Sequence, residues 1–413
     1  MKPIGALAAE PPADAKILIE SGQYNDARAL LDQRLAANSH DVEALFLAGM
    51  LALRQDRLKD AIYSFRKALD LQPKATRIRL ELARALYRAR RDEESDYHFR
   101  LAIADHPPAP VLATIVRFRE SLRARRAWRF NLNFAIAPDS NINAASNTSR
   151  IDVLGIPFRL DPSARARSGV GWIVAGDASL RLRRDSRLPI FLAAYGRSVR
   201  YRDARFNDTY VGGEAGPEVA LSGGRLRLGI TGVRRWFGGH PLLTSVGGRL
   251  HFDKIVAGKL GVEASLAARH FNYARRTDFD GWEYEATGAV NRAFSSTALG
   301  YASITTQRTV DKSPAESNWR IGLRLGIQKE IGWGLRPQLS LDVEKQVNDA
   351  QSPLFGLRRH DWGIEASGSL YKRDWNVAGF APSLKLSWAR NQSTIALYDQ
   401  KRFRLEGGIE KAF

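Results

Sequence analysis

The fold of most of the chain follows from residues 319–328, which read Trp-Arg-Ile-Gly-Leu-Arg-Leu-Gly-Ile-Gln. Apolar side chains occupy every second position, and arginine, glycine or glutamine stands between them. Successive side chains of a β-strand point to opposite faces, so this period of two predicts a strand with one apolar and one polar face. The same alternation recurs in residues 338–344, 362–370 and 380–388. The second part of the chain is therefore predicted to be a β-sheet.

Strand length and the charge of the polar face separate two kinds of sheet. A soluble sandwich also alternates, but its strands average about 5–6 residues, whereas a tilted membrane strand needs about 9–11. The alternating segments here run to about 10–17 residues, which is enough to cross a bilayer. Their polar face carries many arginines and glutamates, which a dry sandwich core excludes and a water-filled lumen accepts. Aromatic residues stand at strand ends, as in the girdles of membrane barrels: Trp172, Tyr201, Tyr210, Trp282, Trp319, Trp375 and Trp388.

The turns and loops between these segments predict a transmembrane barrel of fourteen antiparallel strands. The strands are expected to start near residues 127, 168, 187, 207, 225, 243, 258, 278, 297, 316, 332, 356, 375 and 402. Bacterial barrels have short periplasmic turns and long external loops. Here short connections at 222–224, 294–297 and 332–334 alternate with longer ones at 138–167, 234–243, 273–280, 308–316, 346–356 and 390–401. If the part of the chain before the first strand lies in the periplasm, the short connections fall on the periplasmic side and the long ones on the external side.

The final strand, residues 403–413, ends in Phe413. A terminal phenylalanine resembles the signal that outer-membrane barrels present to the machinery that inserts them. Phe413 is therefore predicted to act in barrel assembly, although Lys411 departs from the usual apolar alternation.

The first hundred residues have a different period. Residues 42–73 fit the 34-residue helix-turn-helix repeat of the tetratricopeptide type, through Gly49, Ala61, Phe65, Ala68 and Pro73. The set returns thirty-four positions later as Ala83, Ser95, Phe99, Ala102 and Pro107. An earlier copy begins at residues 22–27, which match residues 56–61. The pattern predicts an α-helical solenoid that binds peptides or protein segments, with a generic array of helical hairpins as the alternative.

A further helix is expected over residues 111–126, whose apolar side chains fall at helical spacing. It carries Arg117, Arg119, Arg123, Arg125 and Arg126. Two interpretations are open: a solvated capping helix, or arginines set against anionic lipid headgroups at the barrel rim. The predicted domains are a residual export or linker segment over 1–13, the repeats with their linking helix over 14–126, and the barrel over 127–413.

The composition narrows the class of protein. The net charge is +19, from 63 Lys+Arg against 44 Asp+Glu, and such a basic balance suggests nucleic acid as a possible class of partner. The arginines are spread through the alternating segments without a nucleic-acid-binding motif, so no nucleic-acid partner is expected. The absence of cysteine excludes disulfides and zinc–thiolate sites. No run approaches the ~18–20 apolar residues of a transmembrane helix.

The sequence carries no enzyme motif, and no catalytic, cofactor or metal site is predicted. The histidines form no His-x-x-x-His pair, and there is no nucleophile elbow or phosphate-binding loop. The histidines are interpreted as loop or lumen residues: His40, His98, His106, His240, His251, His270 and His360.

One further segment has an unusual composition. Residues 137–147, Ala-Pro-Asp-Ser-Asn-Ile-Asn-Ala-Ala-Ser-Asn, follow the first strand and open the longest loop. Aspartate, serine, asparagine and proline are turn formers, and turn chemistry alone would account for them. The density of amides with a carboxylate would also suit a structured loop that folds back into the pore.

The layout of the whole chain resembles the surface lipoprotein assembly modulator (Slam) family. The resemblance rests on the repeats, the linking helix, the arginine-rich barrel and the segment at the end of the first strand, Pro138, Asp139, Ser140, Asn141, Ile142 and Asn143. It implies an outer-membrane translocon with periplasmic repeats and a fourteen-stranded barrel. Such translocons move lipoproteins or related soluble proteins to the cell surface by type XI secretion.

The same resemblance implies the partners. They are a client lipoprotein or secreted protein, periplasmic chaperones, the barrel-assembly machinery and outer-membrane lipid. Two other functions stay open on sequence alone: a repeat-barrel porin for exopolysaccharide export, and a plain solute porin.

Overall fold

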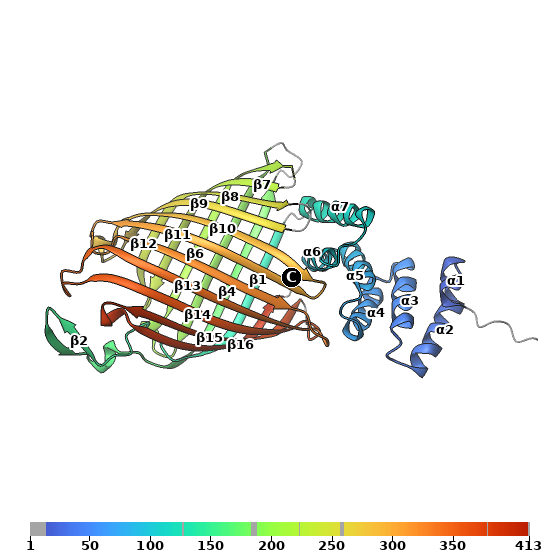
Figure 1. The fold of residues 1–413 in the computed structure, drawn as a ribbon, viewed down its shortest axis with the longest axis horizontal. Helices are drawn as coiled ribbons and strands as arrows, with labels where there is room; N and C mark the ends of the chain where they lie inside the picture. The colour runs from blue at the N-terminus through green and yellow to red at the C-terminus, as the bar shows by residue number, and fades with distance from the viewer. Residues whose placement is uncertain are drawn as a thin grey trace, which may run out of the picture.

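The computed structural model describes residues 14–125, 128–182, 188–222, 224–256, 260–377 and 379–411. Within them, helices stack in a row at one end of a barrel (Figure 1). This confirms the predicted fold class, a helical repeat solenoid followed by a fourteen-stranded antiparallel barrel. Phe413 and the predicted segment 1–13 lie outside the described residues. We call the barrel end that faces the helices the near end, and the opposite end the far end.

The described part of the chain contains seven helices. They are α1 (Ala15–Glu20), α2 (Tyr24–Ala37), α3 (Val42–Arg54), α4 (Leu58–Leu71), α5 (Thr76–Arg88), α6 (Asp92–Ile103) and α7 (Ala109–Arg125). Aspartates cap two of their N-termini: Asp14 accepts from the N–H of Lys16 and Asp41 from that of Ala44, both at 2.9 Å.

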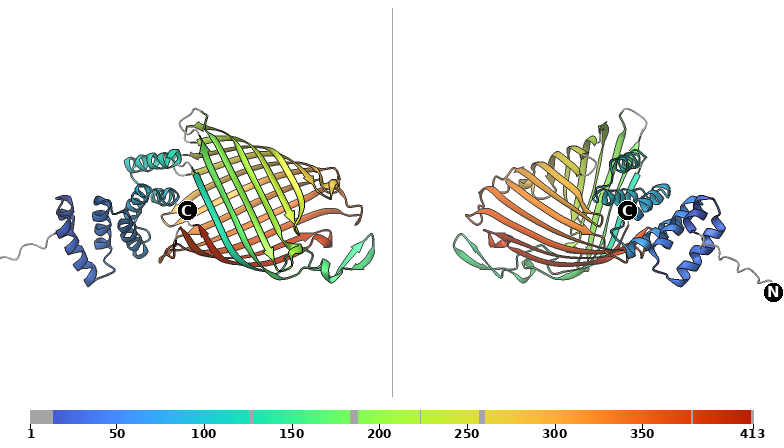
Figure 2. Two further views of the ribbon diagram at one scale, coloured as in Figure 1. Left: turned by 180° about the vertical axis from the view of Figure 1, so that it is seen from behind. Right: turned by 45° about the vertical axis from the view of Figure 1, so that its right-hand side comes forward.

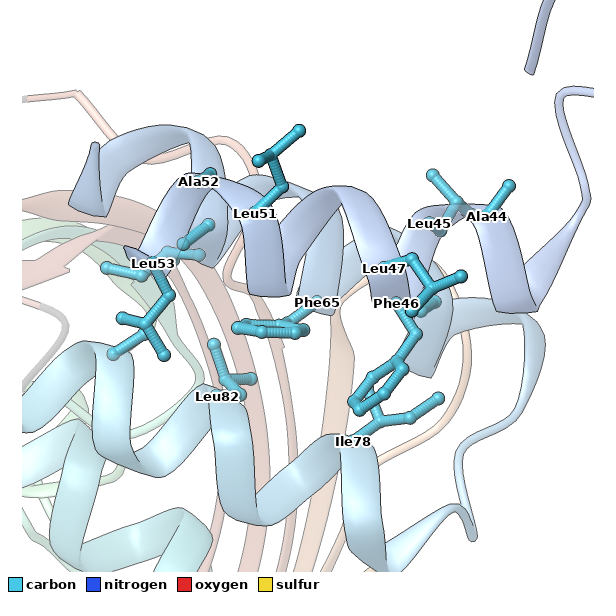
Figure 3. Close-up of a cluster of buried hydrophobic side chains, with 14 of the residues drawn as sticks. Ala44, Leu45, Phe46, Leu47, Leu51, Ala52, Leu53, Phe65, Ile78 and Leu82 are labelled. Carbon is cyan, nitrogen blue, oxygen red and sulfur yellow. The ribbon is translucent and has the colours of Figure 1, made fainter. Parts of the chain in front are cut away.

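Small and large residues interlock between α3 and α4. Phe65 is fully buried, and a Cβ added at Gly49 would lie only 2.5 Å from its ring. Ala61 and Ala68, one turn to either side, are fully buried as well. Figure 3 shows Phe65 between the side chains of α3 and those of α5. Glycine at position 49 therefore lets the two helices approach closely enough to enclose the ring.

Helix α7 packs as part of the repeats. Ala83, Phe99 and Ala102 form a cluster with buried Ile115 and Leu122 of α7. Pro107 lies in the loop that precedes α7.

Two arginines of α7 bind carboxylates of α6. Arg119 is 6% exposed and lies 2.7 Å from Asp96, and Arg125 pairs with Asp92 while its guanidinium lies 3.8 Å from the Tyr87 ring centroid. For these two side chains both earlier interpretations, solvated arginines and arginines on lipid headgroups, are wrong.

The barrel closes in the order β1-β16-β15-β14-β13-β12-β11-β10-β9-β8-β7-β6-β5-β4, with β4 returning to β1, and all pairs are antiparallel. Its described strands are β1 (Trp128–Asp139), β4 (Gly169–Leu182), β5 (Ile190–Tyr201), β6 (Asp208–Leu221), β7 (Gly224–Phe237), β8 (His240–Val256), β9 (Leu260–Tyr273), β10 (Gly281–Ser295), β11 (Ala298–Asp311), β12 (Asn318–Lys329), β13 (Leu335–Gln351), β14 (Arg358–Lys372), β15 (Phe380–Ser393) and β16 (Gln400–Lys411). A separate hairpin of β2 (Arg150–Val153) and β3 (Ile156–Arg159) projects from the far end (Figures 1 and 2).

The two faces of each strand follow the predicted alternation. On β12, Trp319, Ile321 and Leu323 are 45–55% exposed on the outer wall. Arg320 and Arg324 occupy alternate positions to these residues and face the lumen, where they pair with carboxylates of β13. An apolar wall around a charged lumen is the arrangement of a membrane-spanning barrel.

One predicted long loop is wrong. Residues 234–243 belong to β7 and β8, which are joined by Gly238 and Gly239 alone. Both glycines have positive φ, 59° and 81°, as a tight hairpin turn requires. The predicted strand starts otherwise differ by at most five residues, as between 375 and the observed 380. Among the described residues, no helix is both long and apolar enough to cross a membrane.

Candidate functional site: the repeat–barrel junction and the strand seam

The near end of the barrel is joined to the helices by a carboxylate held between two arginines. Glu330 follows β12, and its N–H donates to the carbonyl of Thr297 at 2.7 Å, which ties two neighbouring turns together. Arg79 of α5 donates to Glu330 Oε2 at 2.6 Å, and Arg373, after β14, donates to Oε1 at 2.6 Å. The Arg79 side chain is fully buried. We call Arg79, Glu330 and Arg373 the junction cluster.

Further groups complete this cluster. Arg79 also donates to the carbonyl of Pro73 at 2.6 Å and to Nδ1 of His98 at 3.1 Å. Because a guanidinium only donates, His98 Nδ1 must accept, which places the ring proton on Nε2. Burial lowers the pKa of His98 well below its usual value, in agreement with a neutral ring. Arg373 reaches back to Asp70 of α4, with 3.6 Å between Nη2 and Oδ1.

The junction cluster keeps its carboxylate ionised. Burial alone would raise the pKa of Glu330, but the two guanidinium groups beside it hold that pKa at about 2. Removing one partner from such a buried pair costs about 3–5 kcal/mol, because the other charge is left unpaired. The cluster therefore makes docking specific: both arginines must surround Glu330 when the helices rest on the barrel.

Helix α6 extends the contact along the barrel mouth (Figures 1 and 2). Tyr97 is 3% exposed, and its hydroxyl lies 3.4 Å from Nε2 of Gln328 on β12. The guanidinium of Arg336 lies between two aromatic rings, 5.0 Å from the centroid of Tyr97 and 4.7 Å from that of Tyr371. Aromatic and cationic contacts thus add to the ion pairs in holding α6 at the mouth.

At the far end a second carboxylate is held between two arginines. Asp139 ends β1, and its side chain is fully buried. Arg402 and Arg404 of β16 place Nη2 atoms 2.6 Å and 2.8 Å from Asp139 Oδ2. The hydroxyl of Tyr201, on β5, donates to the same oxygen at 3.2 Å. We call Asp139, Arg402 and Arg404 the seam cluster, because the first strand closes on the last one here.

The residues after Asp139 continue along this seam. The N–H of Ser140 donates to the carbonyl of Phe403 at 2.9 Å, and Ser140 Oγ accepts from the N–H of Phe403 at 2.8 Å. Asn141 donates to the carbonyl of Lys401 at 3.3 Å and is 1% exposed. These bonds attach the chain beyond β1 to β16.

The next two residues attach the same segment to the residues that directly precede β4. Asn143 donates to the carbonyl of Arg165 at 2.8 Å and accepts from the N–H of Arg167 at 3.0 Å. The N–H of Ile142 donates to the carbonyl of Arg167 at 2.8 Å, and its side chain covers Gly169, where an added Cβ would lie 3.1 Å away. Turn chemistry accounts for the end of β1 at Pro138 and Asp139, but not for these bonds. The segment connects β1 to both of its neighbours in the barrel.

Charges of opposite sign are paired across the lumen wall. Arg181 lies 2.9 Å from Glu218, Arg225 lies 3.3 Å from Asp253, and Arg269 lies 3.0 Å from Glu285. Such pairs suit a hydrated interior. The second and third join neighbouring strands and support the strand register, whereas the first joins β4 to β6. Within the described residues there is no group of three side chains that could hold a metal ion.

A closed barrel with an apolar wall, a charged lumen and a docked repeat domain defines an outer-membrane protein whose helices lie in the periplasm. The family model for the surface lipoprotein assembly modifier matches residues 128–413, and a tetratricopeptide-repeat model matches residues 13–76. The chain belongs to the surface lipoprotein assembly modifier family. This is a family of assembly factors and not of enzymes. The near end of the barrel is therefore periplasmic and the far end external.

Curated relatives span most of the chain. It is 26% identical to surface lipoprotein assembly modifier 1 of Neisseria meningitidis, over 90% of this chain and 76% of the relative. It is 23% identical to the surface lipoprotein assembly modifier of Moraxella catarrhalis, over 83% and 68%. It is also 23% identical to the hemophilin secretion modulator of Acinetobacter baumannii, over 89% and 78%.

Sequence reasoning missed the junction cluster. The interpretation of the histidines as loop or lumen residues is wrong for His98, which is fully buried on α6. A signal for Arg79 was present: it lies four residues before Ala83 and three before Leu82, on the apolar face of α5. An arginine on a core face requires a buried partner. Nothing local identifies that partner as Glu330.

Proposed function

We propose that this protein receives client proteins on its periplasmic repeats and delivers them to the cell surface through the barrel. The observation that carries the proposal is the junction cluster, which fixes the repeats to the periplasmic turns so that α6 lies at the barrel mouth. A client held there is concentrated at the entrance, to roughly millimolar levels for a short tether. The names of the relatives, surface lipoprotein assembly modifier and hemophilin secretion modulator, support lipoproteins or secreted proteins as clients.

The function requires a division of labour along the chain. We assign client binding to residues 14–126, translocation to the barrel over 127–413, and export or linkage to residues 1–13. Phe413 serves insertion by the barrel-assembly machinery, and the segment Pro138–Asn143 stabilises the closed barrel. Periplasmic chaperones deliver clients, and outer-membrane lipid surrounds the apolar wall.

The test is deletion of the protein followed by surface proteomics and antibiotic uptake in one strain. We expect one or a few surface proteins to lose protease-accessible display and to regain it when the full chain is restored. Small-solute uptake should stay near its original level. If no surface protein changes while uptake falls, the protein is a solute porin. If a surface polysaccharide is lost, it is a sugar exporter.

A further inference from the structure

A groove of 680 Å³ lies between the repeats and the barrel. One wall is α4, and the other is the periplasmic turn that carries Asp374, Asn376 and Gly379. Leu58 and Ile62 contribute apolar surface to it. Because the two walls belong to different domains, the groove exists only while the junction cluster holds the domains together.

The charges that line the groove are mostly paired. Arg66 and Arg91 both bind Glu94, the latter at 2.7 Å. Asp374 lies 3.2 Å from Arg373. Asp70, which also lines the groove, lies 3.6 Å from Arg373. The three arginines and three carboxylates together leave little net charge to attract a ligand.

Two lysines of α4, unlike the charged residues above, have no ion-pair partner within the described part of the chain. They are Lys59 and Lys67, which line the groove and are exposed. Lys67 Nζ lies 5.0 Å from the ring centroid of Tyr63, which is itself 59% exposed on the groove edge. Tyrosine is enriched at protein interfaces, and the two ammonium groups beside it are available to pair with carboxylates of a ligand.

We propose that this groove binds an extended segment of the client in which acidic and apolar side chains alternate. Carboxylates of the segment pair with Lys59 and Lys67, and its apolar side chains pack on Leu58, Ile62 and the Tyr63 ring. The groove borders the periplasmic rim, so a segment bound in it lies beside the barrel mouth. The identity of the occupant as a client rests on the proposed function, whereas its chemistry rests on the groove.

The test uses purified full-length protein in nanodiscs and two fluorescent ten-residue probes, one alternating glutamate with leucine and one alternating lysine with leucine. The variant is Lys59→Glu/Lys67→Glu, and the matched control is Lys16→Glu/Arg54→Glu, which makes the same charge change at exposed positions outside the groove. We expect the groove variant to bind the acidic probe roughly tenfold more weakly. It should also bind the basic probe more tightly than the unmodified protein does. Equal binding of the acidic probe by both variants would overturn the proposal.

Display of a client in cells separates the two proposals. If the groove variant inserts normally but displays less client than the control variant, the groove is the client site. If both variants display the client fully, the groove proposal fails and the proposed function stands. If even the unmodified chain changes no surface protein, the proposed function fails, and the binding data alone decide the chemistry of the groove.

Discussion

Glu330 at the periplasmic end and Asp139 at the external end are each held between two arginines, but their surroundings differ. Asp139 has additional support: Tyr201 binds the same carboxylate, and Ser140 and Asn141 bond across the seam beside it. Across the domain boundary, Glu330 is supported by longer contacts, such as that of Tyr97 with Gln328 at 3.4 Å and that of Arg373 with Asp70 at 3.6 Å. The same charge arrangement therefore closes a sheet permanently at one end and docks a separate domain at the other.

The largest effect of a substitution is expected at Glu330, where the carboxylate has fewer supporting contacts than Asp139. Glu330→Arg places a third cation between Arg79 and Arg373, and docking should lose about 3–5 kcal/mol. The barrel should still insert, because its strand ladder is untouched. Limited proteolysis between α7 and β1 should accelerate strongly, and client display should fall at least tenfold. Protection equal to that of the unmodified protein would show that the ion pairs do not hold the repeats.

A smaller effect is expected at the seam. Asp139→Asn removes the charge but keeps hydrogen-bond acceptance, and the Arg402 side chain is 32% exposed, so solvent screens part of the loss. We expect a loss of about 1–3 kcal/mol in barrel stability, seen as a lower temperature for conversion of the heat-modifiable form. Asp278→Asn, which breaks an exposed ion pair with Arg276 at the same end, is the control and should leave that temperature unchanged. A shift of equal size in both variants would contradict a special role for Asp139.

The smallest effect is a pH dependence confined to docking. The pKa of His98 is lowered by burial in the docked state, so the undocked state binds more protons as pH falls below about 6.5. Docking should weaken over that range. The contribution of Glu330 is present above its undocked pKa of about 4.3 and is lost as pH falls toward about 2.

Energy transfer between a dye on α3 and one on the periplasmic turn after β14 would measure docking from pH 7.5 to 4.5. The unmodified protein should lose transfer below about pH 6.5, and His98→Gln should stay level down to about pH 4.5. Identical profiles would mean that His98 stays neutral whether or not the repeats are docked.

The sequence was sufficient for elements that rest on local periodicity. Helical spacing located the repeats, and a period of two located the strands to within five residues. It failed at 234–243, which is predicted as a long loop but contains Arg234, Arg235 and Trp236 at the end of β7. These residues lie at a strand tip, where Arg235 pairs with Asp208 and Arg234 lies 5.2 Å from the ring centroid of Trp236.

Both ion clusters were beyond local prediction for a different reason. Arg79 and Glu330 are 251 positions apart, and Asp139 and Arg402 are 263 apart. Their pairing depends on how one domain rests on the other and on which strands close the barrel. The composition of the segment Pro138–Asn143 marks it as unusual, but its bonds to β16 and to the residues before β4 follow only from closure of the barrel.

The paired charges of the lumen also bear on errors during assembly. A one-residue slip of a strand turns every side chain to the opposite face. On β12 such a slip would move Arg320 and Arg324 onto the lipid wall. An arginine there costs about 2–4 kcal/mol at the midplane, which applies to Arg324 near the middle of the strand, and about 0–1 kcal/mol near the interface, which applies to Arg320 at the strand's external end. The slip would also separate them from Glu344 and Asp342, their partners on β13. A barrel with a slipped strand is therefore less stable than the correct one, and the lumen arginines favour the correct strand register.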